Sequence, residues 1–196
     1  MARLERMVIH CTDTPSRLEV SKDDLIHWHM APVNLPNGRV KYKGKIYPSR
    51  EALPDDKIKG YSIKVLNGRG WDRVGYSDMI HRNGEVENLT KYDEDEWVTN
   101  AEMTWGASGI NSSSRHIVLV GGMDGLRTDD FFDNFTEEQF LALRGEVIEF
   151  LANHPDAEIA GHYCYSRKHC PSFDVKEFLS LMSLGGYFDY GKYGKI

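Results

Sequence analysis

The sequence has few cysteines and no long apolar run. Three cysteines among 196 residues cannot all pair with one another, which argues against a small domain held together by disulfide bonds. No stretch approaches the ~20 consecutive apolar residues of a membrane-spanning helix. The N-terminal residues contain only a short apolar stretch, Met7 to Ile9, so we expect no signal peptide. A hydrophobic content of 40% is typical of a globular protein, and the length is typical of one domain.

The formal net charge of −6 is distributed unevenly along the chain. Residues 31–70 contain nine basic and only three acidic residues, so this segment alone carries +6. Four prolines and five glycines lie in the same segment, and at this density they interrupt regular elements. We predict an irregular or hairpin-rich insertion here, with a hairpin at Lys43-Gly44. The acidity of the whole chain argues against a general nucleic-acid binder.

Strand and helix patterns alternate along the rest of the chain. Short apolar runs bounded by turn residues predict strands at 7–10, 74–80, 85–87, 116–120 and 157–161. Capping residues predict helices after Ser21, after Thr136 and after Asp174. This order favours an α/β fold, a single domain with a central mixed β-sheet flanked by helices. We expect the domain to span residues 1–186, and the tail at 187–196 remains unassigned.

Three residues form a candidate metal site: His10, His162 and Cys170. Zinc binds imidazole nitrogen and thiolate sulfur, and a catalytic zinc has three protein ligands. His10 ends one predicted strand and His162 follows another, and strand ends are where sites form in α/β proteins. Cys170 follows the loop 163–169, which is long enough to fold back. On the spacing of His162 and Cys170 alone, a loop histidine and a small buried cysteine are the favoured interpretation.

A series of short motifs in fixed order adds to this pattern. They are Val8-Ile9-His10-Cys11, Trp28-His29, Val74-Gly75-Tyr76, His81 to Glu87, Val120-Gly121-Gly122, Phe135 to Gln139 and Lys168 to Asp174. Together they resemble the type-2 N-acetylmuramoyl-L-alanine amidases, closest to the small phage lysozyme-type amidases, whose fold is shared by peptidoglycan recognition proteins. The resemblance covers residues 7–30 and 71–182 and leaves the basic segment as an insertion.

The resemblance implies zinc held by His10, His162 and Cys170, with Tyr76 and Lys168 as catalytic side chains. Hydrolysis of an amide bond builds up negative charge on the carbonyl oxygen, and the Lys168 ammonium would neutralise it. A tyrosine with a pKa near 10 donates hydrogen bonds more readily than it accepts protons. We therefore expect Tyr76 to stabilise charge first and transfer protons second.

Other polar residues near these motifs have structural interpretations. His27 and His29 point to different faces of a helix, so we expect them to be partly buried beside Trp28. Cys11 follows His10 on a strand, and its side chain should face the core. We expect His169 to be exposed to solvent or to contact one of the metal ligands without binding the metal itself. Whether Cys164 contacts the metal is left open.

The sequence also departs from the family at one place. Relatives often carry a histidine in the loop after the position of Trp105, where this chain has Gly106-Ala107-Ser108. If that histidine contacts substrate or transfers protons in relatives, another side chain must take over this role in the present protein.

The favoured function is zinc-dependent hydrolysis of the bond between N-acetylmuramic acid and L-alanine in peptidoglycan, as a phage-type endolysin. We expect a monomer, made in the bacterial cytoplasm, that reaches the wall after release or specialised export and binds neither nucleic acid nor membrane. Two alternatives are a non-catalytic peptidoglycan recognition protein and a cytoplasmic wall-recycling amidase. The insertion at 31–70 is either a solvated loop or a contact for anionic wall polymers or an acidic partner.

Overall fold

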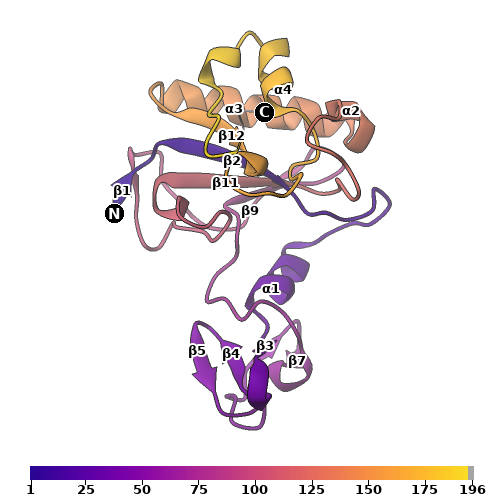
Figure 1. Cartoon of the computed structure of the whole chain (residues 1–196), viewed down its shortest axis with the longest axis vertical. Helices are drawn as coiled ribbons and strands as arrows, with labels where there is room; N and C mark the ends of the chain where they lie inside the picture. Colours follow the sequence, from indigo (N-terminus) through magenta and orange to yellow (C-terminus); the bar gives the residue numbers. More distant parts are fainter. Residues whose placement is uncertain (194–196) are drawn as a thin grey trace. The chain divides into compact units, whose positions relative to one another are not determined.

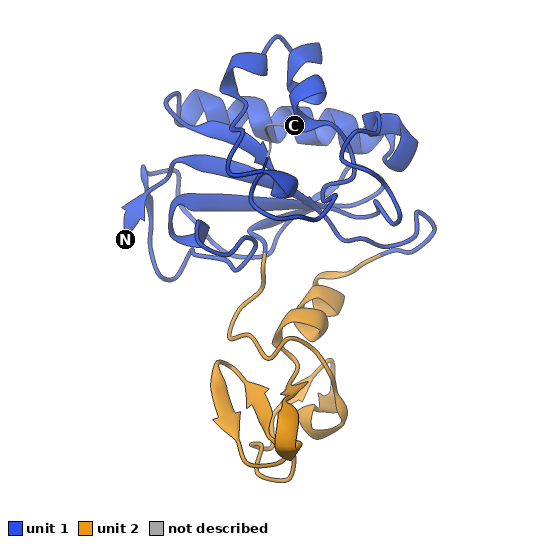
Figure 2. Cartoon of the chain, viewed as in Figure 1, with its two compact units in different colours: residues 1–19, 76–196 blue, residues 20–75 orange. Residues whose placement is uncertain are grey.

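The chain folds into two compact units. The computed structural model describes residues 1–193. The first unit combines residues 1–19 with the chain from Tyr76 onward, and the second comprises Val20–Gly75 (Figure 2). The predicted insertion at 31–70 lies within the second unit, which also includes the helix that precedes it.

A five-stranded mixed sheet organises the first unit. Its order is β12-β2-β11-β8-β9, formed by Glu158–Gly161, Arg6–Cys11, Ser114–Leu119, Asp78–Ile80 and Val86–Asn88. The first four strands run parallel to one another, and β9 is antiparallel to β8. A separate pair, β1 (Ala2–Arg3) with β10 (Trp97–Val98), lies outside this sheet. The predicted α/β fold with a central mixed sheet is confirmed.

Three helices of the first unit lie together along one side of the sheet (Figure 1). They are α2 (Phe131–Asn134), α3 (Glu137–Asn153) and α4 (Val175–Leu181). Leu143, Val147 and Phe150 of α3 are buried against strand residues such as Ile9 and Ile117 in one apolar core. Because side chains alternate along a strand, His10 and His116 point to the opposite face of the sheet.

Local sequence signals fix the ends of these elements. Thr136 and Gln139 form the predicted capping box of α3. The predicted turn at Asn83-Gly84 joins β8 to β9, and Gly84 has a φ of +82°. A Cβ atom on Gly84 would come within 2.8 Å of the carbonyl oxygen of Glu138, so the turn and the start of α3 require glycine there.

The element boundaries differ from the sequence expectation in three places. The predicted strand 74–80 is confined to Asp78–Ile80. Gly185-Gly186 is the sequence signal for the end of the last helix, but the helix ends at Leu181, where the Met182 N–H bonds back to the carbonyls of Leu179 and Ser180. Helix α2 was not predicted, since four residues are too few to establish a periodic pattern.

The described part of the tail docks on the sheet through Phe188, which bridges to Ile159. Positions 194–196 lie outside the described residues.

The second unit is a small helix-and-hairpin module. Helix α1 (Lys22–Met30) is capped by Ser21 as predicted. Strands β3 (Val33–Asn34), β4 (Val40–Tyr42) and β5 (Lys45–Tyr47) form an antiparallel sheet whose β4–β5 turn is the predicted Lys43-Gly44 hairpin. A second hairpin pairs β6 (Lys57–Ile58) with β7 (Tyr61–Ser62). The second unit has an apolar core of its own, built from Ala31, Val40, Tyr42, Leu53, Ile58 and Ile63. No helix within residues 1–193 is long and apolar enough to cross a membrane.

The first unit contains a polar cavity of about 320 Å³ beside β8 and α3. Asp78 lies at its floor with 3% of its surface exposed, and the Asn88 amide donates a hydrogen bond of 3.0 Å to its carboxylate. Burial raises the pKa of Asp78 to about 6. It also raises the pKa of Glu146, on the cavity wall, to about 7. Both carboxylates therefore oppose folding when they are ionised.

Replacement of Asp78 by asparagine should stabilise the protein at neutral pH. The pKa of Asp78 is higher in the folded than in the unfolded protein, so its ionisation costs folding free energy. This cost is absent below the unfolded pKa near 3.8 and complete above about 6. We expect Asp78→Asn to increase the free energy of unfolding by up to ~3 kcal/mol at pH 8. The gain should disappear near pH 4, as measured by urea denaturation at both pH values.

The control is Asp156→Asn, because Asp156 is largely exposed and pairs only with the exposed Arg3. This change should alter stability by less than ~0.5 kcal/mol. An Asp78→Asn gain of the same size at pH 4 and pH 8 would show that ionisation of Asp78 is not the cause.

Candidate metal centre

Two neighbouring parallel strands each lead to a histidine at the same edge of the sheet. In the pairing of β12 with β2, Gly161 lies opposite Ile9. The next residue of β2 is His10, and the next residue after β12 is His162, which starts a short 3₁₀ turn. The two imidazole rings are therefore close, with centroids 4.6 Å apart. This is the arrangement expected at the carboxyl ends of parallel strands.

The loop 163–169 brings Cys170 to the same place. The Tyr163 N–H donates a hydrogen bond of 2.8 Å to the carbonyl of Cys170, which closes the loop. Cys170 Sγ then lies 3.8 Å from His10 Nδ1. The backbone N–H of Cys11 donates to the same sulfur at 3.3 Å.

One nitrogen from each histidine and the Cys170 sulfur all lie within 4.8 Å of one another. His10 is buried, whereas His162 and Cys170 are partly exposed. Burial raises the pKa of the Cys170 thiol, while the charge of Lys168 acts in the opposite direction. The donor set consists of two imidazoles and one thiol, and a bound divalent cation would deprotonate the thiol. This donor set fits zinc. The role of these three residues as zinc ligands remains a prediction.

The two predicted catalytic side chains approach this cluster from different segments. The Tyr76 ring lies 5.0 Å from the His10 ring, measured between centroids, and is partly buried. Lys168 is exposed on the loop between His162 and Cys170, and its backbone N–H donates to Ser166 Oγ at 3.3 Å. The structure thus places the Tyr76 ring beside His10 and puts Lys168 two residues before Cys170 on an exposed loop. Their catalytic roles are still to be tested.

A third histidine lies behind the cluster. His116 Nδ1 is 3.0 Å from His10 Nε2, and the side chain is completely buried. Burial, together with the smaller effects of the nearby His162 and Arg6, lowers the pKa of His116 to about 3. In the sequence this residue looked like the polar start of an apolar strand. Parity within the strand groups His116 with Val118, but only the pairing of β11 with β2 shows that this face also carries His10.

The other cysteines and His169 occupy separate places. Cys164 is fully buried in the apolar core, where burial raises its pKa to about 12. It is not part of the ligand-atom group found among residues 1–193. Cys11 belongs to the same core, as predicted, although its backbone serves the site. His169 is exposed and its Nδ1 accepts a hydrogen bond from the Arg127 N–H at 3.5 Å.

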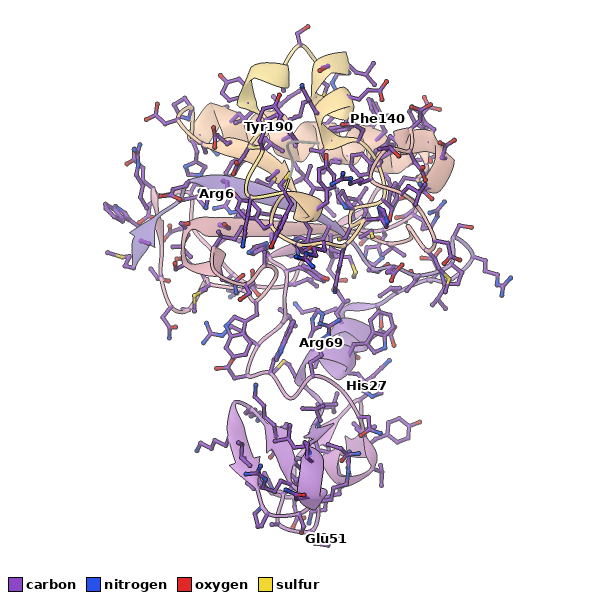
Figure 3. The ribbon with its side chains drawn as sticks, in the orientation of Figure 1. Arg6, His27, Glu51, Arg69, Phe140 and Tyr190 are labelled. Atoms are coloured by element: carbon purple, nitrogen blue, oxygen red, sulfur yellow. The ribbon has the colours of Figure 1, made fainter. Side chains whose placement is uncertain are left out.

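The histidines of α1 have structural surroundings in the second unit. His29 is buried, its ring stacks on Trp71 with centroids 5.0 Å apart, and its Nδ1 accepts from the Gly75 N–H. Burial lowers the pKa of His29 to about 4, with a smaller effect of Arg69. His27 belongs to α1 and is partly exposed, and Arg69 lies beside the same helix (Figure 3).

Comparison with known proteins agrees with this geometry. No family model matches the chain. An endolysin of Enterobacteria phage K11 is 35% identical over 116 residues, which cover 59% of this chain and 70% of that endolysin. An endolysin of Escherichia phage T7 is 36% identical over 110 residues, 56% of this chain and 66% of that protein.

Solved structures share the fold at lower sequence identity. The N-acetylmuramoyl-L-alanine amidase endolysin LysCS of Clostridium intestinale has a TM-score of 0.55 and 14% identity, over 93% of this chain and 85% of that one. Bumblebee PGRP-SA has a TM-score of 0.55 and 13% identity, over 92% and 82% of the two chains. The predicted family and fold are therefore confirmed, and the chain belongs to the family of phage endolysins.

Proposed function

We propose that the protein is a zinc-dependent amidase that cleaves the bond between N-acetylmuramic acid and L-alanine in peptidoglycan. The observation that carries this proposal is the convergence of His10, His162 and Cys170, whose donor atoms lie within 4.8 Å of one another. Membership of the endolysin family and the amidase fold support it. Three ligands of this kind match a catalytic zinc, which keeps one position for water or substrate.

The chain's own residues divide the work of catalysis. A bound zinc ion supplies a Lewis acid and an activated water at neutral pH. Lys168, on the exposed loop before Cys170, is placed to neutralise the negative charge that develops on the scissile carbonyl oxygen. Tyr76, beside His10, donates its phenolic proton in a hydrogen bond to the same developing charge.

Peptidoglycan or its fragments are the proposed substrate. The structures with this fold include peptidoglycan recognition proteins LCa and LCx bound to tracheal cytotoxin, with a TM-score of 0.52. For the present chain we propose action on the cell wall after the protein gains access to it. A cytoplasmic amidase that recycles soluble muropeptides would use the same residues and differ only in the form of the substrate.

We also propose that the second unit binds anionic wall polymer through its unpaired basic side chains. Lys43, Lys59 and Lys64 form ion pairs with Asp56, Asp24 and Asp55. By contrast, no ion pair or hydrogen bond within residues 1–193 engages the exposed side chains of Arg39, Lys45 and Lys57. Unpaired cations on one small module favour contact with carboxylates or phosphates.

The amidase proposal predicts a defined product. Purified protein should release peptides with a free L-alanine N-terminus from peptidoglycan, as identified by mass spectrometry. Lys168→Ala should lower turnover by roughly 10²–10³-fold, the scale of a lost oxyanion donor, while zinc content is unchanged. Arg167→Ala is the matched control, because it removes a neighbouring exposed cation from the same loop.

Two outcomes would contradict this assignment. Stoichiometric zinc without amide cleavage would support the non-catalytic recognition protein instead. Cleavage of the glycan chain in place of the amide bond would indicate a glycosidase. Normal turnover of Lys168→Ala would remove Lys168 from the mechanism.

The zinc site itself is tested by comparing two cysteines. Cys170→Ala should lose most of the bound zinc, because a site with three protein ligands would lose its only thiolate. Cys164→Ala should retain zinc, since Cys164 is packed in the apolar core. Zinc content is measured by atomic absorption after dialysis. Zinc retained by Cys170→Ala but lost by Cys164→Ala would reverse the assignment.

The role of the second unit is tested with two triple variants of equal charge change. Replacement of Arg39, Lys45 and Lys57 by glutamine should weaken binding to purified cell walls and reduce its salt dependence. The control replaces the paired residues Lys43, Lys59 and Lys64 by glutamine. Its affinity for cell walls should be closer to that of the wild type. Binding is measured by co-sedimentation at two salt concentrations, with hydrolysis of a soluble muropeptide as the check on the active site. Equal binding by all three proteins would make the basic residues a solvated surface.

A further inference from the structure

We infer that His116 is a positioning residue that holds His10 in the orientation needed to bind the metal. This inference rests on the proposed zinc site and deepens it. It concerns a residue outside the predicted ligand and catalytic sets, and it follows from the hydrogen bond between the two histidines.

The pairing of β11 with β2 puts His116 within reach of His10. In the parallel register, Val118 lies opposite His10 and His116 lies opposite Val8. All four side chains share the face of the sheet away from the core helices. His116 Nδ1 therefore reaches His10 Nε2 diagonally at 3.0 Å, with the ring centroids 5.2 Å apart.

The two nitrogens of His10 face different partners. Nδ1 lies 3.8 Å from Cys170 Sγ and is the nitrogen on the side of the proposed ligands. A nitrogen that binds a metal must present its lone pair, so the proton of a neutral His10 is on Nε2. Nε2–H then donates its hydrogen bond to His116 Nδ1, which acts as the acceptor.

The backbone of His116 is fixed by Ser77, and its ring makes one polar contact. Its backbone is held on both sides by Ser77, since the Ser77 N–H donates to the His116 carbonyl at 2.7 Å and Ser77 Oγ accepts from the His116 N–H at 3.3 Å. The ring is completely buried. Its Nε2 has no hydrogen-bond partner within the described part of the chain, so the other nitrogen, Nδ1, makes the polar contact of this ring.

The expected effect is on metal affinity. A partner that binds the remote nitrogen of a ligating histidine fixes its tautomer and ring orientation, and its loss typically costs 10–100-fold in metal affinity or activity. His116 supplies such a partner from a strand that carries none of the proposed ligands.

The test compares two replacements of His116 in the full-length protein. Asparagine places an amide oxygen near the position of Nδ1 and can still accept the hydrogen bond, whereas leucine fills the space without an acceptor. We expect His116→Leu to bind zinc 10–100-fold more weakly in competition with a chromophoric chelator, and His116→Asn to retain most of the affinity. With cobalt in place of zinc, the visible absorption spectrum should change in His116→Leu and be preserved in His116→Asn.

His154→Leu is the control for loss of a buried histidine. The His154 ring packs on Phe150 with centroids 5.0 Å apart. Its Nε2 makes no hydrogen bond among residues 1–193 and lies 3.6 Å from a carboxylate oxygen of Glu94. This variant should lower the thermal midpoint but leave zinc affinity unchanged. Wild-type affinity in His116→Leu, or equal losses in the leucine and asparagine variants, would overturn the inference alone. A wild-type protein that binds no zinc would overturn the proposed function, and the inference with it.

Discussion

The parallel pairing of β2 with β12 and β11 is the constraint on which the site depends. One register places Gly161 opposite Ile9 and Val118 opposite His10. Since successive side chains alternate, a slip of one residue would turn His10 into the apolar core and Ile9 out of it. The apolar contacts of Ile9 and Ile117 with α3 therefore stabilise the position of the imidazole as well as the fold.

The cluster draws on a strand and on a loop of the chain. His10 is held within a six-residue strand that lies between β12 and β11. Cys170 comes from a loop whose ends are joined by the Tyr163–Cys170 hydrogen bond. Lys168 lies on that loop and is exposed. The proposed ligands thus come both from the sheet and from the loop after β12, and the proposed catalytic Lys168 shares that loop.

The sequence predicted those features that depend on local patterns. His10 and His162 could be found because each follows an apolar run, and the capping box at Thr136 marks the start of α3 on its own. Family resemblance added Tyr76 and Lys168. His116 could not be found in this way, because its importance depends on which strand pairs with β2 and in what register. Asp78 was hidden for the same reason, since its burial arises from helix α3 packing across the strand.

The hydrogen bond from the Cys11 N–H to Cys170 Sγ has a consequence for sequence variation. Its donor is a peptide group, so no change of side chain at position 11, apart from proline, removes it. An amide that points at sulfur withdraws negative charge from a thiolate and leaves a bound cation more electron-poor. This hydrogen bond is therefore encoded in the path of the backbone and persists when the side chain of residue 11 changes. The Cys11 thiol also acts on the Cys170 sulfur, and that second interaction does depend on the side chain.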